Sequence, residues 1–186
     1  ISKSIEDNAR ILEVVAGKDG KDATCSSKEV PQYAAAQARE TYRVAFFKEL
    51  LENEGIQPEI REAYGSLIQE LKALGHELVE AEFPYPEYIL PTYYILTTAE
   101  ASTNLSRYDG AHYGHRSEST IDLESMYKQS RTEGLGDEVR RRIMLGTFVL
   151  SADYYDAYFT KAQKVRRLIK NATEKTLRDC DFIITP

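Results

Sequence analysis

The sequence predicts a helix-rich α/β fold that contains few strands. Apolar runs flanked by turn-forming residues predict only three strands, at 43–47, 77–83 and 181–185. Most of the remaining chain carries apolar residues at helical spacing. Three short strands form too small a sheet for this much helix, and a sheet edge needs partners or protection. We therefore expect the 186 residues to be an internal part of one larger α/β domain.

The N-terminal part of the chain is predicted to contain a helix, a long loop and a second, short helix. Ser4, with Asp7 three residues later, is typical of a helix N-cap, and Gly17 is a natural end for that helix. Residues 17–32 are rich in charged and turn-forming residues, which favours a loop. The second helix is expected over 33–41.

The middle of the chain predicts a strand–helix–strand unit. The strand at 43–47 is followed by a helix that begins at Pro58 and ends at Gly75, and the strand at 77–83 follows at once. If the two strands are parallel, we expect a right-handed crossover between them. Apolar residues at helical spacing dominate the rest of the chain and predict helices over 87–106, 121–132, 137–150 and 152–178.

Composition restricts the class of protein. Acidic residues number 30 and basic residues 24, so the net charge of −6 is a poor match for a phosphate backbone. The mean hydropathy of −0.48 and the lack of an apolar run of roughly 20 residues indicate a soluble globular protein. Cys25 and Cys180 match no metal or redox spacing, so we expect two reduced thiols in a cytoplasmic protein.

Three blocks of sequence point to a family. The first is TAEASTNLSRYDGAHYG at 98–114, and the second is RTEGLGDEVRRRIMLGTF at 131–148. The third combines YYDAY at 154–158 with KAQKVR at 161–166. In this order and spacing, the blocks resemble the A-subunit family of the tRNA-dependent amidotransferases, within the wider amidase-signature family. The resemblance covers most of the chain, and residues 30–53 depart from it most.

The resemblance implies a fold and a catalytic centre. The fold is the amidase-signature fold, a mixed sheet covered by helices. The catalytic centre is a Lys and two Ser in a Gly/Ser-rich stretch, which lies upstream of the segment that matches residues 1–17. The nearest candidate in this chain is Cys-Ser-Ser-Lys at 25–28, but it has no glycine-rich flank, so a polar loop is favoured. We expect no catalytic residue in this chain, and no activity from it alone.

The resemblance also implies residues that bind glutamine. In the family, an arginine of an Arg-Arg-Ile segment holds the α-carboxylate of glutamine, and a tyrosine lies nearby. By motif, the arginine maps onto Arg142, and the tyrosine maps onto the Tyr93–Tyr94 pair, with Tyr93 the preferred member. The acidic residue that would hold the α-amino group is expected downstream of Pro186.

Helical periodicity gives Arg142 partial support of its own. The apolar stripe of this helix consists of Val139, Ile143, Gly146 and Leu150. Arg142 lies about 60° from the stripe, and Arg140 and Arg141 lie farther from it. Arg142 is thus the arginine expected to point inward, where its planar fork could bind a carboxylate in two places. The alternative is a helix of solvated or ion-paired arginines, with Glu138 as the local partner of Arg142.

Other polar residues give weaker signals. His112 and His115 have a spacing found in some metal sites, but a surface loop is favoured because no Cys and no third His is close by in sequence. Asp153 and Asp156 are better explained as residues of a first helical turn than as a catalytic carboxylate pair. The pattern assigns no role to Glu100, Ser102 and Asn104.

The last predicted helix contains two further groups. Its tyrosines favour core packing over a cofactor site, and they are Tyr154, Tyr155 and Tyr158. Its basic residues favour a solvated face over an RNA contact, and they are Lys161, Lys164, Arg166, Arg167 and Lys170.

The resemblance implies glutamine hydrolysis within a tRNA-dependent amidotransferase. The released ammonia would convert Glu-tRNA(Gln) to Gln-tRNA(Gln), or Asp-tRNA(Asn) to Asn-tRNA(Asn). A partner subunit is expected to hold most of the charged tRNA and to use ATP and Mg²⁺, whereas this chain is expected to bind no cofactor and no metal. Two alternatives stay open: another amidase-signature hydrolase that acts on simple amides, and a non-catalytic helical interaction module.

Overall fold

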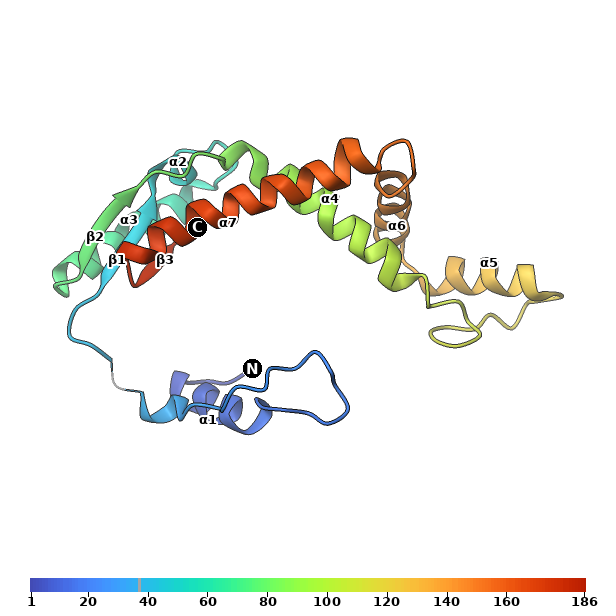
Figure 1. Ribbon diagram of the computed structural model, residues 1–186, viewed down its shortest axis with the longest axis horizontal. Coiled ribbons are helices and arrows are strands. Elements are labelled where there is room, and N and C mark those ends of the chain that lie inside the picture. Colours follow the sequence, from blue (N-terminus) through green and yellow to red (C-terminus); the bar gives the residue numbers. More distant parts are fainter. Residues whose placement is uncertain (37) are drawn as a thin grey trace. The chain divides into compact units, whose positions relative to one another are not determined.

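The computed structural model describes residues 1–36 and 38–186, and Figure 1 shows its helices and strands. The chain forms two compact units, residues 1–41 and residues 42–186. Among the described residues, no helix combines the length and the apolar character that crossing a membrane requires.

The unit of residues 1–41 contains the helix α1 (Ile5–Val15). The Ser4 hydroxyl oxygen accepts a hydrogen bond from the Asp7 N–H at 3.0 Å, which confirms the predicted N-cap. Gly17 follows the helix with a φ of +119°, in the left-handed region that favours glycine. Residues 17–32 contain no helix and no strand, so the predicted loop is confirmed.

The helix predicted over 33–41 is wrong. The structure has a 3-10 turn there, η1 (Tyr33–Ala35), and Ala36 is already extended, with a φ of −63° and a ψ of 121°. Residue 37 lies outside the described residues. The alanines favour a helix, but η1 buries none of its residues, so no packing offsets the cost of nucleating a helix this short.

The unit of residues 42–186 contains a parallel sheet of three strands. The strands are β1 (Arg43–Phe47), β2 (Glu77–Ala81) and β3 (Phe182–Ile184), and their order is β2-β1-β3. Both neighbouring pairs are parallel. The three predicted strands are confirmed, and β2 and β3 are shorter than predicted. The central strand forms the core, with Val44, Ala45 and Phe47 buried.

Two helices connect β1 to β2. The short helix α2 (Lys48–Leu51) directly follows β1 and was not expected from the sequence. The predicted helix from Pro58 is confirmed as α3 (Pro58–Ala73), which buries Tyr64 and Ile68. The Tyr64 hydroxyl donates a hydrogen bond to the Ile184 carbonyl, and burial raises the pKa of Tyr64 to about 12. This bond joins α3 to the end of β3.

The remaining helices follow β2. They are α4 (Pro86–Leu105), α5 (Leu123–Gly134), α6 (Asp137–Val149) and α7 (Lys161–Asp179). The first three confirm the predicted helices to within two residues at each end. Helix α4 packs against both α6 and α7 (Figure 1), and α7 leads back to β3.

The prediction of one continuous helix over 152–178 is wrong at its beginning. A π-helix, η2 (Tyr155–Thr160), precedes α7, and residues 151–154 form a turn. The N–H groups of Tyr154 and Tyr155 both donate to the Ser151 carbonyl, and the Tyr154 ring lies 4.3 Å from the Phe148 ring, centroid to centroid. Apolar periodicity does not reveal this change because Tyr155, Tyr158 and Ala162 keep helical spacing through the π-helix.

Candidate substrate-binding site

Helices α4 and α6 approach each other closely at Gly146. A Cβ atom at this position would lie 2.0 Å from the Thr98 carbonyl oxygen and 2.6 Å from the Ser102 Cβ. Only glycine allows backbones to approach at this distance. The hydroxyl groups of Ser102 and Thr147 share a hydrogen bond of 2.9 Å beside the contact. The contact therefore fixes the position of α6 against α4.

Arg142 lies one turn before Gly146 and contacts two tyrosines of α4. Its Cζ atom lies 5.8 Å from the centroid of the Tyr94 ring, within the range of a cation–π interaction. Its Nε donates a hydrogen bond to Glu138 Oε1 at 3.0 Å. Hydrogen bonds with the Tyr93 side chain and with Glu138 hold the pKa of Arg142 above its ordinary value. The structure thus brings together the two residues predicted to bind glutamine, Arg142 and Tyr93.

The three neighbouring arginines of α6 differ in exposure. The side chain of Arg142 is 35% exposed, against 41% for Arg140 and 73% for Arg141. The order agrees with the expectation that Arg142 points inward most. The predicted local ion pair is also present, because Glu138 bonds to Arg142 through one carboxylate oxygen and to Arg141 through the other. The local ion pair of the alternative is therefore present, and Arg142 is the least exposed of the three arginines by a small margin over Arg140.

This arrangement suits the binding of a carboxylate. A guanidinium presents five N–H donors in a plane, and its geometry matches the two oxygens of a carboxylate. A tyrosine ring beneath the plane stabilises the positive charge, and a tyrosine hydroxyl beside it can donate a further hydrogen bond. No other chemistry is evident in these groups, since none of them is a nucleophile with a neighbouring base.

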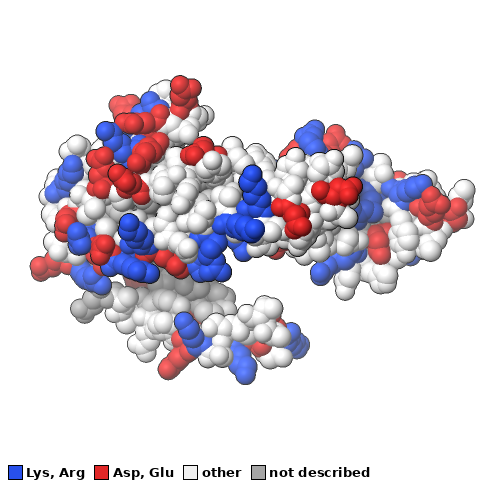
Figure 2. All heavy atoms as spheres, turned by 45° about the horizontal axis from the view of Figure 1, so that its top comes forward, with Lys and Arg blue, Asp and Glu red and all other residues white. Residues whose placement is uncertain are grey.

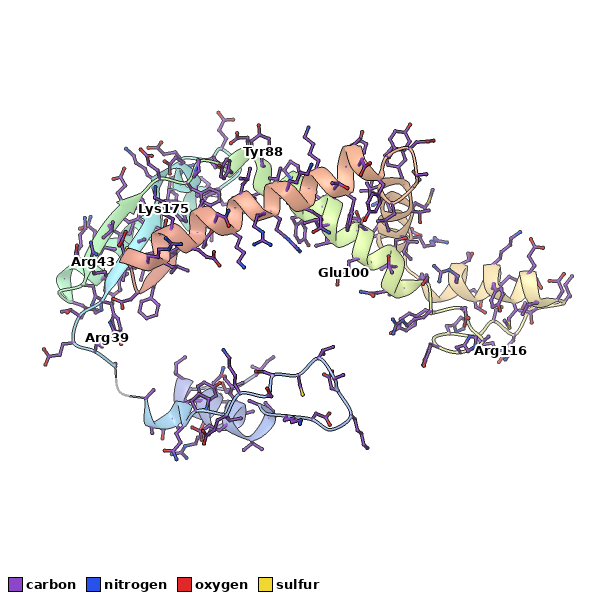
Figure 3. All side chains as sticks on the ribbon, viewed as in Figure 1. Arg39, Arg43, Tyr88, Glu100, Arg116 and Lys175 are labelled. Carbon is purple, nitrogen blue, oxygen red and sulfur yellow. The ribbon has the colours of Figure 1, made fainter. Side chains whose placement is uncertain are left out.

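The residues of α4 that had no predicted role lie on different sides of the helix. Ser102 contacts α6, as described above. Glu100, marked in Figure 3, and Asn104 line a hollow of about 260 Å³ between α4 and α7, together with Gln163 and Arg166. The sequence reasoning did not identify the packing role of Ser102 or of Gly146, although Gly146 was part of the predicted apolar stripe.

The loop of residues 106–122 is held by polar contacts. Arg131 donates from one Nη atom to the carbonyl oxygens of Leu105 and Tyr108, at 2.9 and 2.8 Å, which caps the end of α4. Asp109 accepts hydrogen bonds from the backbone N–H groups of Ala111 and His112 and contacts the His112 ring. These bonds, those of His112 above all, hold the pKa of Asp109 well below its ordinary value.

The two histidines of this loop have separate partners. His112 Nδ1 lies 2.8 Å from Asp109 Oδ2, and His115 Nε2 lies 2.8 Å from Glu133 Oε2. Hydrogen bonds from His115 and from Ser117 hold the pKa of Glu133 below its ordinary value. Within residues 1–36 and 38–186, no group of three or more His, Cys, Asp or Glu side chains is arranged to hold a metal ion.

The remaining candidates from the sequence are located as follows. Cys25, in the loop of residues 25–28, lies 3.0 Å from the Asp19 backbone nitrogen, and that loop is largely exposed. Asp156 accepts a hydrogen bond from Thr160 inside η2. The basic residues of α7 include Lys170, which pairs with Glu174 at 3.4 Å. Figure 2 shows acidic and basic side chains interspersed over the visible face of the molecule.

The chain resembles known proteins over its whole length. Residues 1–186 match the protein family described as Amidase. The A subunit of the glutamyl-tRNA(Gln) amidotransferase of Fusobacterium nucleatum subsp. nucleatum is 48% identical over 188 residues, which cover 100% of this chain and 38% of that protein. The protein of the same name from Oceanobacillus iheyensis is 46% identical, with the same coverage of both chains.

A solved structure agrees with the fold. The crystal structure of the A subunit of the glutamyl-tRNA(Gln) amidotransferase from Thermotoga maritima shares 32% sequence identity and a TM-score of 0.65. The match covers 100% of this chain and 36% of that one. The helix-rich α/β fold is therefore confirmed, and the chain spans about 38% of the length of the curated relatives that it matches.

Proposed function

This chain belongs to the amidase family, and we propose that it is part of the glutamine-hydrolysing subunit of a tRNA-dependent amidotransferase. The whole protein would release ammonia from glutamine and pass it to partner subunits in the cytoplasm. The names of the relatives support Glu-tRNA(Gln) as the substrate that receives the ammonia, with Asp-tRNA(Asn) as the alternative. The partners would hold the charged tRNA and use ATP and Mg²⁺.

The role proposed for this chain is to bind glutamine through Arg142 and Tyr93. The observation that carries the proposal is the position of the Arg142 guanidinium, which lies over the Tyr94 ring, next to Tyr93, and bonds to Glu138 where α4 and α6 meet. A guanidinium held in place in this way can bind the α-carboxylate of glutamine through two hydrogen bonds.

Binding the α-carboxylate would fix one end of the substrate. The side-chain amide at the other end would then be presented to a nucleophile from another part of the whole protein. That nucleophile would form an acyl ester and release ammonia, and water would hydrolyse the ester to glutamate. Correct placement of the amide is the contribution of Arg142, because proximity and orientation account for much of the rate of such a step.

Ammonia release by the whole protein tests this proposal. Glutamine should be hydrolysed far faster than simple amides, and the rate should rise when the partner subunits and charged tRNA are added. Release from simple amides that does not depend on partners would instead assign the protein to the general amidases. No release from any amide would contradict an enzymatic role and favour an interaction module.

A further inference from the structure

Besides Tyr93, two further residues contact the Arg142 guanidinium and restrict its orientation. Glu138 lies four residues earlier on the same helix and accepts from Nε at 3.0 Å. The second oxygen of this carboxylate accepts from Arg141 Nη1, so the Glu138 carboxylate is itself held at both oxygens. The contact at Nε restricts rotation of the guanidinium about the axis of its side chain.

Tyr94 restricts the position of the Arg142 guanidinium from a second side. The Arg142 Cζ lies 5.8 Å from the centroid of its ring. The Tyr94 ring is in turn packed against Tyr93, with centroids 5.4 Å apart and an angle of 67° between the ring planes. The ring supports the guanidinium from one side, whereas Glu138 holds its edge.

Together these contacts are suited to substrate binding more than to stability. An exposed ion pair within one helix contributes little to the stability of a fold. An arginine side chain, however, has several rotatable bonds, and ordering them costs free energy when a ligand binds. Contacts that order the side chain in advance reduce this cost. Because the Glu138 carboxylate binds at Nε, the two Nη atoms can still bind a second carboxylate end-on.

We infer that Glu138 and Tyr94 are positioning residues, which hold the Arg142 guanidinium so that its outer edge meets the α-carboxylate of glutamine. The inference rests on the proposed function, since it concerns the same site. It adds that the affinity for glutamine depends on two residues that need not touch the substrate.

The test uses the whole enzyme with its partners and measures KM for glutamine. The substitution Glu138→Ala removes the contact at Nε, and Tyr94→Leu removes the aromatic face. Each should raise KM for glutamine about threefold, as expected for the loss of one exposed charge or cation–π contact. Glu138→Gln retains an oxygen that accepts from Nε, and Tyr94→Phe retains the ring, so both should stay closer to the wild type.

Two measurements separate positioning from a general structural effect. The first is the inhibition constant of 4-aminobutanamide, which is glutamine without its α-carboxylate, and this constant should not change. The second is the matched variant Glu124→Ala, which breaks an exposed ion pair with Lys128 at 2.5 Å on α5, four residues apart as in the Glu138 pair. This control should leave KM for glutamine unchanged.

The outcomes distinguish the inference from the function on which it rests. If Arg142→Ala raises KM for glutamine but Glu138→Ala and Tyr94→Leu do not, the positioning role is refuted and the proposed function stands. If Arg142→Ala has no effect either, the glutamine site itself is refuted. Equal changes for glutamine and for 4-aminobutanamide would show that the variants distort the site generally, which also overturns the inference.

Discussion

Substitution of Gly146 should perturb the candidate site, because Gly146 contacts α4 one helical turn away from Arg142. In Gly146→Ala the new methyl group would lie 2.0 Å from the Thr98 carbonyl oxygen and 2.6 Å from the Ser102 Cβ. An ordinary contact needs about 3.4 Å, so α6 must move away from α4 by about 1.4 Å, and because the clash is with backbone such overpacking costs about 2–3 kcal/mol, the upper part of the usual range. The gain in helix propensity from alanine offsets about 1 kcal/mol of this.

The net effect expected is a loss of about 1–2 kcal/mol in the free energy of unfolding, or a few degrees in Tm. Because α6 carries Arg142, KM for glutamine should also rise. Gly65→Ala is the matched control, since a Cβ at this position in α3 would have no atom within 4 Å apart from its chain neighbours and the backbone of its own helix. The control should be as stable as the wild type or more stable. Thermal unfolding and glutamine kinetics of the whole protein provide the assay, and an unchanged Tm and KM in Gly146→Ala would show that the position of α6 does not depend on this glycine.

Two further predictions concern pH and local order. Tyr64→Phe should lower the free energy of unfolding by about 1 kcal/mol, because the Ile184 carbonyl loses its donor. The unfolded state loses the Tyr64 proton near pH 10 and the folded state only near pH 12, so the stability of the wild type should fall between these values. Chemical unfolding below and above pH 10 should show a smaller fall in the free energy of unfolding for Tyr64→Phe than for the wild type. An equal fall in both proteins would contradict the assignment of this titration to Tyr64. Asp109→Ala should increase amide hydrogen exchange at Ala111 and His112, whose N–H groups bond to this carboxylate. Since the pKa of Asp109 is depressed, its contribution to stability should be complete above pH 3.8 and be lost as the pH falls further. If the Ala111 and His112 amides were as well protected from exchange in Asp109→Ala as in an Asp153→Ala control, this role would be contradicted.

The sequence predicted the long elements because their signals are local and repeated. Helix α3 has a proline at its first position and a regular apolar stripe, and the strands are short apolar runs between turns. Two elements were misjudged for physical reasons. Residues 33–41 carry helix-forming alanines but bury none of η1, and η2 changes the helical period without changing the apolar pattern.

The candidate site was only partly accessible to sequence reasoning. Periodicity placed Arg142 nearest the apolar stripe of α6, and its lower exposure agrees with that placement. Periodicity could not show which tyrosines of α4 it would meet, because that depends on how α4 and α6 cross. The crossing depends in turn on Gly146, whose missing side chain matters only once the Thr98 carbonyl is known to face it. Likewise, no local pattern joins Arg131 to the end of α4.

Whether Arg142 binds the α-carboxylate of glutamine is tested by KM for glutamine in the variant Arg142→Ala. In the whole enzyme with its partners, KM should rise about tenfold or more, as expected when a charge-assisted pair of hydrogen bonds is lost. The inhibition constant of 4-aminobutanamide should stay unchanged, because this amide has no α-carboxylate. An unchanged KM for glutamine, or an equal loss of affinity for both compounds, would show that Arg142 does not bind the α-carboxylate.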